Sequence, residues 1–408
     1  MFQDTYHPAT NGVVVSTDLF IDELKRRGHE VLLIAPRHPD YKEPAPEGVH
    51  LIPAVSAEFI YPGASLGKFW AGNVGPLLEQ FRPDIMHSMT EFTIGHWVAS
   101  YFREKMHLKR VHTFHTLWTE YFFYLPIPTA IVNRWFQYVA PRCCRKRFDQ
   151  VLVPSEAMRD TVSSEWGVDV PLDVLPTGLH LDRFKGGVGE RFRQRYGIAE
   201  DERDLLYLGR LGDEKNVELV VDTMAELRRR GEPRVKLVIA GGGPDAYLRK
   251  LHARCDALGL ADVIWTGFVR GQDWLDTYAG ADIVLFPSTT ETQGLVVVES
   301  LAAGKPLVSI EAMGPGSVMK GERGCLFATN DARDFADKTQ RLLHDDVLYQ
   351  RKRREAAEVA QSYSIEQRGA ELEAIYYRVL GQAPVELVNS VEPVSAEPRR
   401  NLPHRKVV

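Results

Sequence analysis

The sequence predicts an α/β protein made of two doubly wound domains, and three observations support this prediction. The chain has 408 residues, which is more than one hydrophobic core usually serves. Short apolar runs of strand length alternate with helical segments along both halves, as parallel sheets with crossover connections require. Hydrophobic residues make up 44% of the chain and charged residues 26%, which is ordinary for a globular protein.

The first half begins with a short strand and a turn at residues 8–12. A helix is expected from Val14 to Arg27, because its apolar residues recur at helical spacing and Gly28 ends it. The pair Gly186-Gly187 is typical of a flexible linker between domains, so we predict a first domain over residues 1–185. Its further strands are expected at residues 31–35, 85–87, 111–114 and 150–153.

The second half alternates more regularly, and we predict a second domain over residues 186–360. Residues 361–383 are predicted to be a C-terminal helix that can pack back on the first domain. Residues 384–408 are rich in proline and polar residues, which predicts a disordered tail. The expected strands of the second domain are 205–208, 235–240, 263–266, 283–286 and 306–310, with helices at 217–230 and 246–258 among them.

Bulk properties argue against several classes of protein. The net charge of −5 does not favour nucleic acid as a partner. No apolar run approaches the roughly 20 residues that span a bilayer, and the N-terminus lacks the pattern of a secretory signal. The four cysteines show neither metal-ligand spacing nor a disulfide framework, which favours a reducing cytoplasm.

One segment, residues 103–147, departs from this average. It holds nine basic residues against two acidic ones, and aromatic side chains are interleaved with them. This pattern suits the surface of an anionic membrane. A pair of ordinary helices with buried aromatics and a solvated basic face fits equally well. The interleaved aromatic residues include Trp118, Tyr121, Phe122, Phe123, Tyr124, Trp135, Phe136 and Tyr138.

Two carboxylates eight positions apart mark the most informative motif. Glu291 follows the apolar run 281–287 in a polar loop, and Glu299 lies about two turns into the helix that comes next. Backbone N–H groups at a helix N-terminus attract anions, while a carboxylate deeper in the helix can reach sugar hydroxyls. The motif therefore suggests a nucleotide-sugar site, although glutamates at this spacing also occur by chance on helix surfaces.

Two basic residues, Arg210 and Lys215, follow the first strand of the second half and precede its helix. There they would neutralise a diphosphate, or they would simply be charges in a polar loop. Gly12 ends the first turn of the chain and either lets a phosphate or sugar approach the backbone or serves only the turn. The glycine run 241–243 lacks the spacing of a dinucleotide fingerprint and is expected to be structural.

Two histidines flank Phe114 at the end of a predicted strand. His115 falls at the carboxyl end, where α/β sheets place their ligands, whereas His112 is expected to be buried. The sequence has no Asp-x-Asp pair, no Walker loop and no nucleophile elbow. We therefore expect no metal and no cofactor, so that basic side chains and helix N-termini supply the positive charge.

Together these residues resemble the retaining glycosyltransferases of family 4, whose GT-B fold has two Rossmann-like domains facing across a cleft. The matches extend from residue 4 to residue 299 and so cover most of the chain. The sequence of residues 290–295, and the pair His115-Thr116 before Tyr121, are most similar to the motifs of the branch that glycosylates diacylglycerol or related lipids. The matching residues are Asp4–Pro8, Asn11-Gly12, His112–Thr116, Pro154-Ser155, Gly178, Phe184, Gly209-Arg210, Lys215-Asn216, Glu291 and Glu299.

The resemblance implies a role for each candidate residue. His115 and Glu291 would lie at the reaction centre, and Gly12 would border the phosphate pocket. Retention would follow from front-face attack as the diphosphate leaves, and no carboxylate nucleophile is evident in the sequence. The donor-binding residues would be Arg210 and Lys215 on the diphosphate, Glu299 on the ribose, and Gly294 and Leu295 with Glu291 on the sugar.

The family normally begins with several apolar residues that form a complete first strand, but here only Met1 and Phe2 precede Gln3. We therefore expect either an upstream start or a short central strand.

The activity expected from this resemblance is transfer of glucose or mannose from a UDP- or GDP-hexose to a diacylglycerol-type or phosphatidylinositol-type lipid. The enzyme would be cytoplasmic and peripherally bound to the inner face of the cell membrane through residues 103–147. A glycosyltransferase with a soluble or polymeric acceptor is the alternative, and a non-catalytic nucleotide-sugar-binding protein is a third reading.

Overall fold

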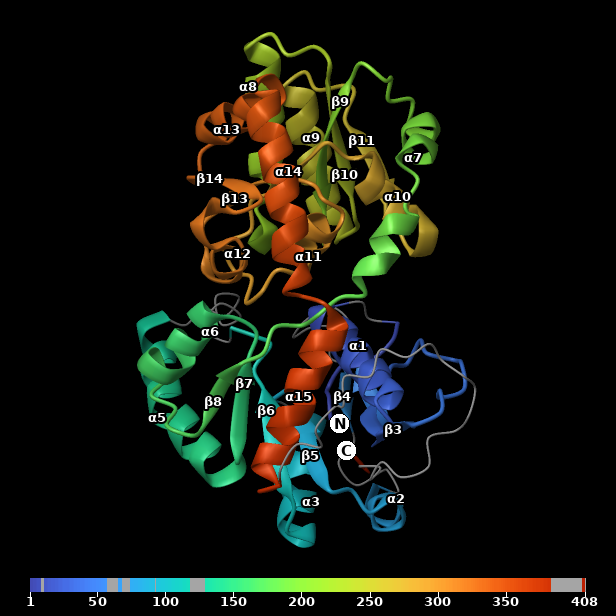
Figure 1. The fold of residues 1–408 in the computed structure, drawn as a ribbon, viewed down its shortest axis with the longest axis vertical. Helices are drawn as coiled ribbons and strands as arrows, with labels where there is room; N and C mark the ends of the chain where they lie inside the picture. The colour runs from blue at the N-terminus through green and yellow to red at the C-terminus, as the bar shows by residue number, and fades with distance from the viewer. Residues whose placement is uncertain are drawn as a thin grey trace, which may run out of the picture. The chain divides into compact units, whose positions relative to one another are not determined.

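The computed structural model describes residues 1–8, 11–56, 65–67, 74–91, 93–117, 129–382 and 406–407. The chain forms two compact units, which are described separately below (Figure 1). The first unit combines Met1–Gly178 with Ile365–Val408, and the second is Leu179–Ser364. The chain passes between the units after Gly178 and after Ser364. The predicted domain boundaries, after residues 185 and 360, lie near these two positions but do not coincide with them.

The second unit is built on a parallel sheet of six strands in the order β11-β10-β9-β12-β13-β14. The strand order reverses between β9 and β12, and ligands of doubly wound sheets bind at such a switch point. The strands are β9 (Arg203–Leu208), β10 (Val235–Ala240), β11 (Ile264–Gly267), β12 (Ile283–Phe286), β13 (Leu307–Ile310) and β14 (Cys325–Ala328).

Helices enclose this sheet, and their apolar faces complete its core. Val220, Val221 and Met224 of α8 are buried with Leu205 and Leu237 of the sheet. The helical segments are η4 (Leu181–Gly186), α7 (Gly189–Tyr196), η5 (Asp213–Lys215), α8 (Val217–Arg229), α9 (Asp245–Ala257), α10 (Gly271–Gly280), α11 (Leu295–Ala302), α12 (Met313–Val318), η6 (Lys320–Glu322), α13 (Ala332–His344) and α14 (Asp346–Gln361).

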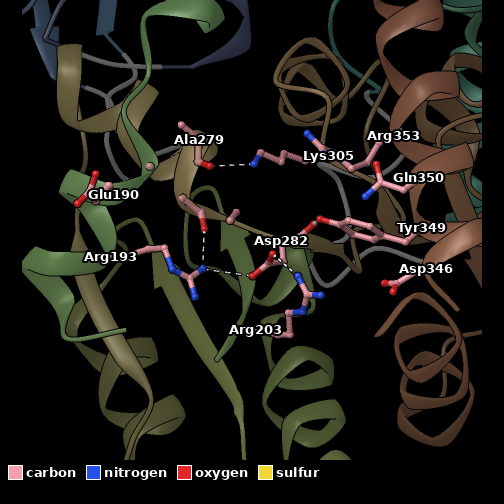
Figure 2. A pocket seen from close by; sticks show the side chains of 13 residues that line it. Glu190, Arg193, Arg203, Ala279, Asp282, Lys305, Asp346, Tyr349, Gln350 and Arg353 are labelled. Atoms are coloured by element: carbon pink, nitrogen blue, oxygen red, sulfur yellow. Dashed lines mark hydrogen bonds and ion pairs between the residues drawn. The ribbon is translucent and has the colours of Figure 1, made fainter. Parts of the chain in front are cut away.

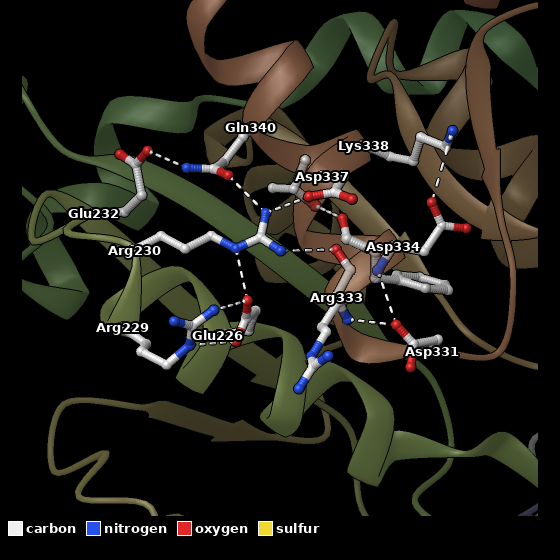
Figure 3. A network of polar contacts seen from close by, with 12 residues as sticks. Glu226, Arg229, Arg230, Glu232, Asp331, Arg333, Asp334, Asp337, Lys338 and Gln340 are labelled. Carbon is white, nitrogen blue, oxygen red and sulfur yellow. Dashed lines mark hydrogen bonds and ion pairs between the residues drawn. The ribbon is translucent and has the colours of Figure 1, made fainter.

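A charged network joins the end of α8 to α13 (Figure 3). The Arg230 guanidinium contacts Glu226 at 2.7 Å, Asp337 at 2.5 Å and Gln340 at 2.8 Å. Hydrogen bonds from Arg229 and Arg230 lower the pKa of Glu226 to about 2. One planar guanidinium thus satisfies acceptors from two helices at once, which fixes their spacing.

The first unit holds a six-stranded sheet in the order β1-β15-β5-β6-β7-β8 and a three-stranded sheet β2-β3-β4. Among the strands that the structure describes here, only β3 and β4 pair in the antiparallel sense. The strands are β1 (Glu30–Val31), β2 (Leu33–Arg37), β3 (Val49–Ser56), β4 (Ser65–Gly67), β5 (Ile85–Ser88), β6 (Lys109–Thr113), β7 (Gln150–Val153), β8 (Leu172–Val174) and β15 (Lys406–Val407).

The helices of the first unit include one from the far end of the sequence. Helix α15 packs on α1, where Gly369 lies directly against Glu23 and a Cβ atom would approach Glu23 Cγ to 2.2 Å. Tyr376 of α15 also contacts His87 Nδ1 at 2.7 Å. The helical segments are α1 (Gly12–Arg26), α2 (Val74–Phe81), η1 (Thr93–Val98), α3 (Ala99–Met106), α5 (Thr129–Arg147), α6 (Glu156–Asp160), η3 (Thr161–Glu165) and α15 (Ile365–Val379).

Both ends of the chain enter the sheet of the first unit. Phe2 is fully buried and bridges Ile34 to Ser88, and β15 pairs with β1 on one side and β5 on the other. The prediction of a disordered tail is therefore wrong for Lys406 and Val407, since a tail that pairs on both sides and buries Val407 is ordered there. Residues 383–405 lie outside the described part of the chain.

Candidate functional site

Six of the eight predicted site residues lie in the second unit, at the switch point of its sheet. Arg210 and Lys215 follow β9, whereas Glu291, Gly294, Leu295 and Glu299 follow β12. Because β9 and β12 are adjacent and parallel, their carboxyl ends open at the same edge. The structure therefore brings these two distant segments together, as the sequence predicted for a shared site.

Two ion pairs organise the basic side chains at this edge. Lys215 Nζ donates to Glu291 Oε1 at 2.5 Å, and Arg210 contacts Glu214. All four side chains are partly buried, so each carboxylate holds its cation at the edge of the sheet. A diphosphate entering here would compete with these carboxylates for the same cations. Glu291 is therefore a partner of Lys215, a contact that sequence reasoning did not foresee.

The N-terminus of α11 supplies backbone donors at the same edge. Gly294 precedes the helix with φ of 81°, a left-handed conformation that favours glycine. As the N-cap residue, Gly294 makes no side-chain cap hydrogen bond. The first N–H groups of a helix have no intrahelical acceptor, and their dipoles attract negative charge. The contact of Gly294 and Leu295 with the donor stays a prediction.

Glu299 lies one turn deeper and is held by aromatic donors. Tyr278 Oη donates to Glu299 Oε2 at 2.7 Å, and the Trp274 side chain also donates to this carboxylate. Burial raises the pKa of Glu299 to about 7, although the two hydrogen bonds act in the opposite direction. Sequence reasoning missed Trp274 and Tyr278. Their spacing of four residues on α10 places them on one helix face, which is the signal that could have found them.

The raised pKa of Glu299 predicts that this residue lowers the free energy of unfolding as the pH rises. Between about pH 4.5 and pH 7 the unfolded chain ionises this group while the folded protein holds the proton, so ionisation opposes folding as the pH rises. We expect the free energy of unfolding of Glu299→Gln, relative to wild type, to increase by about 1–3 kcal/mol from pH 5 to pH 8. Urea denaturation of both proteins at four pH values measures this, and a constant difference would contradict it.

Gly314 supports the loop that carries Glu291. A Cβ atom on Gly314 would lie 2.5 Å from Cα of Gln293, and its backbone N donates to Glu291 O at 3.0 Å. We expect Gly314→Ala to displace this loop and weaken donor binding at least tenfold, or about 1.4 kcal/mol. Gly316→Ala is the matched control on α12, because its Cβ atom would approach Glu311 no closer than 3.4 Å, at Cγ. Equal donor affinity of the two variants would contradict this prediction.

The glycine run 241–243 packs against the segment that carries Arg210. A Cβ atom on Gly241 would lie 1.8 Å from Gly209 O, and one on Gly243 would lie 2.0 Å from Leu211 O. These glycines let two neighbouring loops at the edge approach closely. The structural role expected for the run is confirmed.

The other two predicted residues, Gly12 and His115, lie in the first unit. Gly12 is the exposed first residue of α1, and Asn11 Oδ1 accepts from Val14 N at 3.0 Å to cap this helix. His115 follows β6 and is half-buried, and burial lowers its pKa to about 4. Its imidazole is therefore neutral at pH 7. The predicted aromatic residues between 118 and 128 lie outside the described part of the chain.

His112 is buried, as predicted. Its Nδ1 lies 2.8 Å from Ser88 Oγ, and its ring stacks on Phe148 at 4.3 Å between centroids. It therefore belongs to the packing of the first unit.

A metal site is not evident in the part of the chain that the structure describes. No group of three His, Cys, Asp or Glu side chains there could hold a metal ion. Metal independence of the reaction remains a prediction. Likewise, no helix among the described residues is long and apolar enough to span a bilayer.

Comparisons with known proteins agree with this geometry. Residues 10–183 match the model of Glycosyltransferase Family 4, and residues 188–361 match that of Glycosyl transferases group 1. An alpha-monoglucosyldiacylglycerol synthase of Streptococcus pneumoniae is 32% identical over 324 residues, which cover 76% of this chain and 70% of that protein. A GDP-mannose-dependent alpha-mannosyltransferase of Corynebacterium glutamicum is 26% identical over 360 residues, covering 84% of this chain and 79% of that protein.

Solved structures show the same fold. Anabaena Alr3699/HepE in complex with UDP has a TM-score of 0.71 at 17% identity, covering 92% of this chain and 98% of that one. WaaG, described as a glycosyltransferase of lipopolysaccharide biosynthesis, has a TM-score of 0.68 at 16% identity, with 92% and 98% covered. With a relative above 30% identity over most of both chains, and two Rossmann-like units that match solved glycosyltransferases, this chain is a glycosyltransferase that belongs to family 4 and has the GT-B fold.

Proposed function

We propose that this enzyme transfers glucose or mannose, with retention of configuration, from a UDP- or GDP-hexose to a lipid acceptor at a membrane surface. The acceptor would be a diacylglycerol-type or phosphatidylinositol-type lipid. The observation that carries the lipid part is an exposed aromatic face on α5 in the first unit. The printed name of the Streptococcus pneumoniae relative, which refers to a glucosyldiacylglycerol, supports the same choice.

The aromatic face of α5 follows helical spacing. Ile131, Trp135 and Tyr138 are 60%, 53% and 62% exposed, and they lie four and seven positions apart on one side of the helix. Arg142 continues this side and stacks on Tyr138, with its guanidinium carbon 3.7 Å from the ring centroid. Large apolar side chains rarely gather on a surface that contacts only water. Tryptophan, tyrosine and arginine together suit the interface of a membrane.

This exposure supports the membrane-surface interpretation of residues 103–147 where side chains are described. A core packing of Trp135 and Tyr138 does not hold. The basic surplus, however, is smaller than the sequence suggests. Asp149, just beyond the segment, pairs with Arg103 at 3.2 Å and with Lys109 at 2.9 Å. Arg145 pairs with Asp169, which also lies beyond the segment. Aromatic insertion should therefore contribute more to membrane binding than net charge.

The donor part of the proposal rests on charge at the edge of the second unit. As the diphosphate leaves, negative charge develops on its oxygens, and Arg210, Lys215 and the N-terminus of α11 would stabilise it. The reaction then needs no metal, and His115 and Glu291 would face the reacting sugar. Activity that persists in EDTA is the expected result. A thermal-shift panel of UDP-glucose, UDP-galactose and GDP-mannose identifies the donor, because a ligand of the folded state raises the melting temperature.

Vesicle binding tests the lipid acceptor. The double variant Trp135→Ser, Tyr138→Ser should bind vesicles of anionic phospholipid at least tenfold more weakly than wild type, and it should lose lipid glycosylation while donor binding is kept. Val347→Ser is the matched control, because Val347 is an exposed apolar side chain of the second unit, at 80% exposure. Unchanged sedimentation with vesicles and unchanged transfer to lipid would contradict the proposal.

A soluble acceptor is the alternative outcome of this test. A D-inositol 3-phosphate glycosyltransferase of Corynebacterium aurimucosum is 28% identical over 314 residues, covering 72% of this chain and 71% of that protein. Transfer to a water-soluble sugar phosphate by wild type and by the double variant at equal rates would favour that reading.

A further inference from the structure

A second polar pocket lies in the second unit, at the amino ends of its strands. Its volume is about 360 Å³. Figure 2 shows the side chains that line it. Arg203 begins β9, Ala281 and Asp282 precede β12, and Lys305 precedes β13, so these residues line one side of the pocket. The donor-binding residues follow the carboxyl ends of the same strands. The pocket is therefore a separate site at the opposite edge of the sheet.

Two helices complete the lining. Helix α7 contributes Glu190 and Arg193. Helix α14 contributes residues three, four and seven positions after the first, which places all of them on one helix face. The α14 residues are Asp346, Tyr349, Gln350 and Arg353.

Two cations in this pocket have no carboxylate partner among the described residues. Lys305 Nζ donates only to Ala279 O, at 2.8 Å, and Arg353 Nε donates only to Gly304 O, at 3.3 Å. The other N–H groups of both side chains are available to a ligand. Burial and, to a smaller extent, the charge of Arg353 lower the pKa of Lys305 to about 8, although the charges of Asp282 and Asp204 act in the opposite direction. Two neighbouring cations that repel each other mark a place for an anion.

The remaining arginines of the pocket are already paired. Arg193 and Arg203 share Asp282, at 3.3 and 3.1 Å (Figure 2). Asp204 lies beside this group, fully buried and without a hydrogen bond to its carboxyl oxygens, and burial raises its pKa well above the usual value. Asp282 is the carboxylate with which both arginines form ion pairs. The lining thus keeps a positive character where Lys305 and Arg353 meet.

We propose that this pocket binds a small phosphorylated compound, whose phosphate is held by Lys305 and Arg353. Arginine and lysine N–H groups are the usual donors to phosphate oxygens. Gln350, Glu190 and Asp346 face the rest of the pocket with an amide and two carboxylates, groups that hydrogen-bond to hydroxyls. The ligand class is therefore a phosphate monoester with a hydroxylated carbon part. This inference does not rest on the proposed sugar donor or acceptor.

Isothermal titration tests the site with sn-glycerol 3-phosphate and inorganic phosphate as probes. The titrations use Lys215→Met, so that the donor site loses one of its cations. We expect both probes to bind this variant, and Lys305→Met with Arg353→Gln added to weaken binding at least tenfold. Binding should also weaken from pH 7 to pH 9, because Lys305 loses its proton over this range. Lys305→Arg should keep most of the affinity.

Arg323→Gln is the control, since Arg323 is an exposed arginine that pairs with Glu358 and does not line the pocket. It should leave the affinity for both probes unchanged. The proposal is overturned if neither probe binds Lys215→Met, or if the Lys305 and Arg353 substitutions leave the affinity unaltered. Failure of the donor panel described above would leave these outcomes unaffected, so the two proposals fail separately.

Discussion

Replacing Lys215 with methionine is expected to lower kcat/KM by about 10²–10³-fold. Methionine keeps the length and the apolar stem of lysine but removes the charge that would meet the leaving diphosphate. Fixed positive charge at the point where negative charge develops typically contributes this much to an enzymatic rate. Initial rates with the donor identified by the thermal-shift panel measure the effect. Most of the loss should appear in kcat if the interaction strengthens as the diphosphate leaves.

The control for this prediction is Lys250→Met. Lys250 is an exposed lysine of the same unit that pairs with Asp213 and Glu218. Its replacement should change kcat/KM by less than about twofold, because exposed ion pairs contribute little. Glu291 loses its partner in Lys215→Met, so the melting temperature of both variants should be compared with wild type. A Lys215→Met enzyme that is folded and fully active would exclude Lys215 from the donor site.

Asp4→Ala is expected to destabilise the first unit by about 3–5 kcal/mol, since it removes a fully buried acceptor that serves several donors. The Asp4 carboxylate is 3% exposed, and burial raises its pKa despite these hydrogen bonds. Without it, four donors of the segment 90–95 would be left in a buried site. The donors are Thr90 Oγ1 at 2.6 Å, Thr93 Oγ1 at 2.9 Å, Ile94 N at 2.6 Å and Gly95 N at 3.2 Å.

Urea denaturation followed by tryptophan fluorescence measures this effect, because Trp97 and Trp166 report on the first unit. Asp40→Ala is the matched control; Asp40 is exposed, and its replacement should change the free energy of unfolding by less than about 0.5 kcal/mol. The free energy of unfolding of Asp4→Asn should lie between those of Asp4→Ala and Asp40→Ala, since an amide keeps one acceptor oxygen. Equal stability of Asp4→Ala and wild type would show that the network around Asp4 is not needed for folding.

The donor half of the site could be predicted because it depends on local order in the sequence. A residue that follows a strand of a parallel sheet must lie at the carboxyl edge, and Arg210 and Glu291 each follow a clear apolar run. The hydrogen bond from Tyr278 to Glu299 could not be predicted in this way. It joins two helices whose contact is decided by packing. The local sequence pattern does not show which faces of the two helices come into contact.

Charge counting along the chain has a similar limit. Residues 103–147 carry a surplus of basic side chains, but Asp149 neutralises two of them from just beyond the segment. Short strands were also missed: β4 and β8 have three residues each, too few for a periodic signal. The single apolar run at 31–35 became β1 and β2, which belong to different sheets.

The route of the chain also bears on how the protein is made. The second unit is one continuous stretch of the chain. The first unit includes α15 and β15, which are synthesised after the second unit. Domains generally fold as units during synthesis, and contacts between distant residues form slowly. The second unit can therefore complete its fold on the ribosome while the first still lacks a helix and a strand. The six-stranded sheet of the first unit thus becomes continuous only after Lys406 and Val407 have been translated.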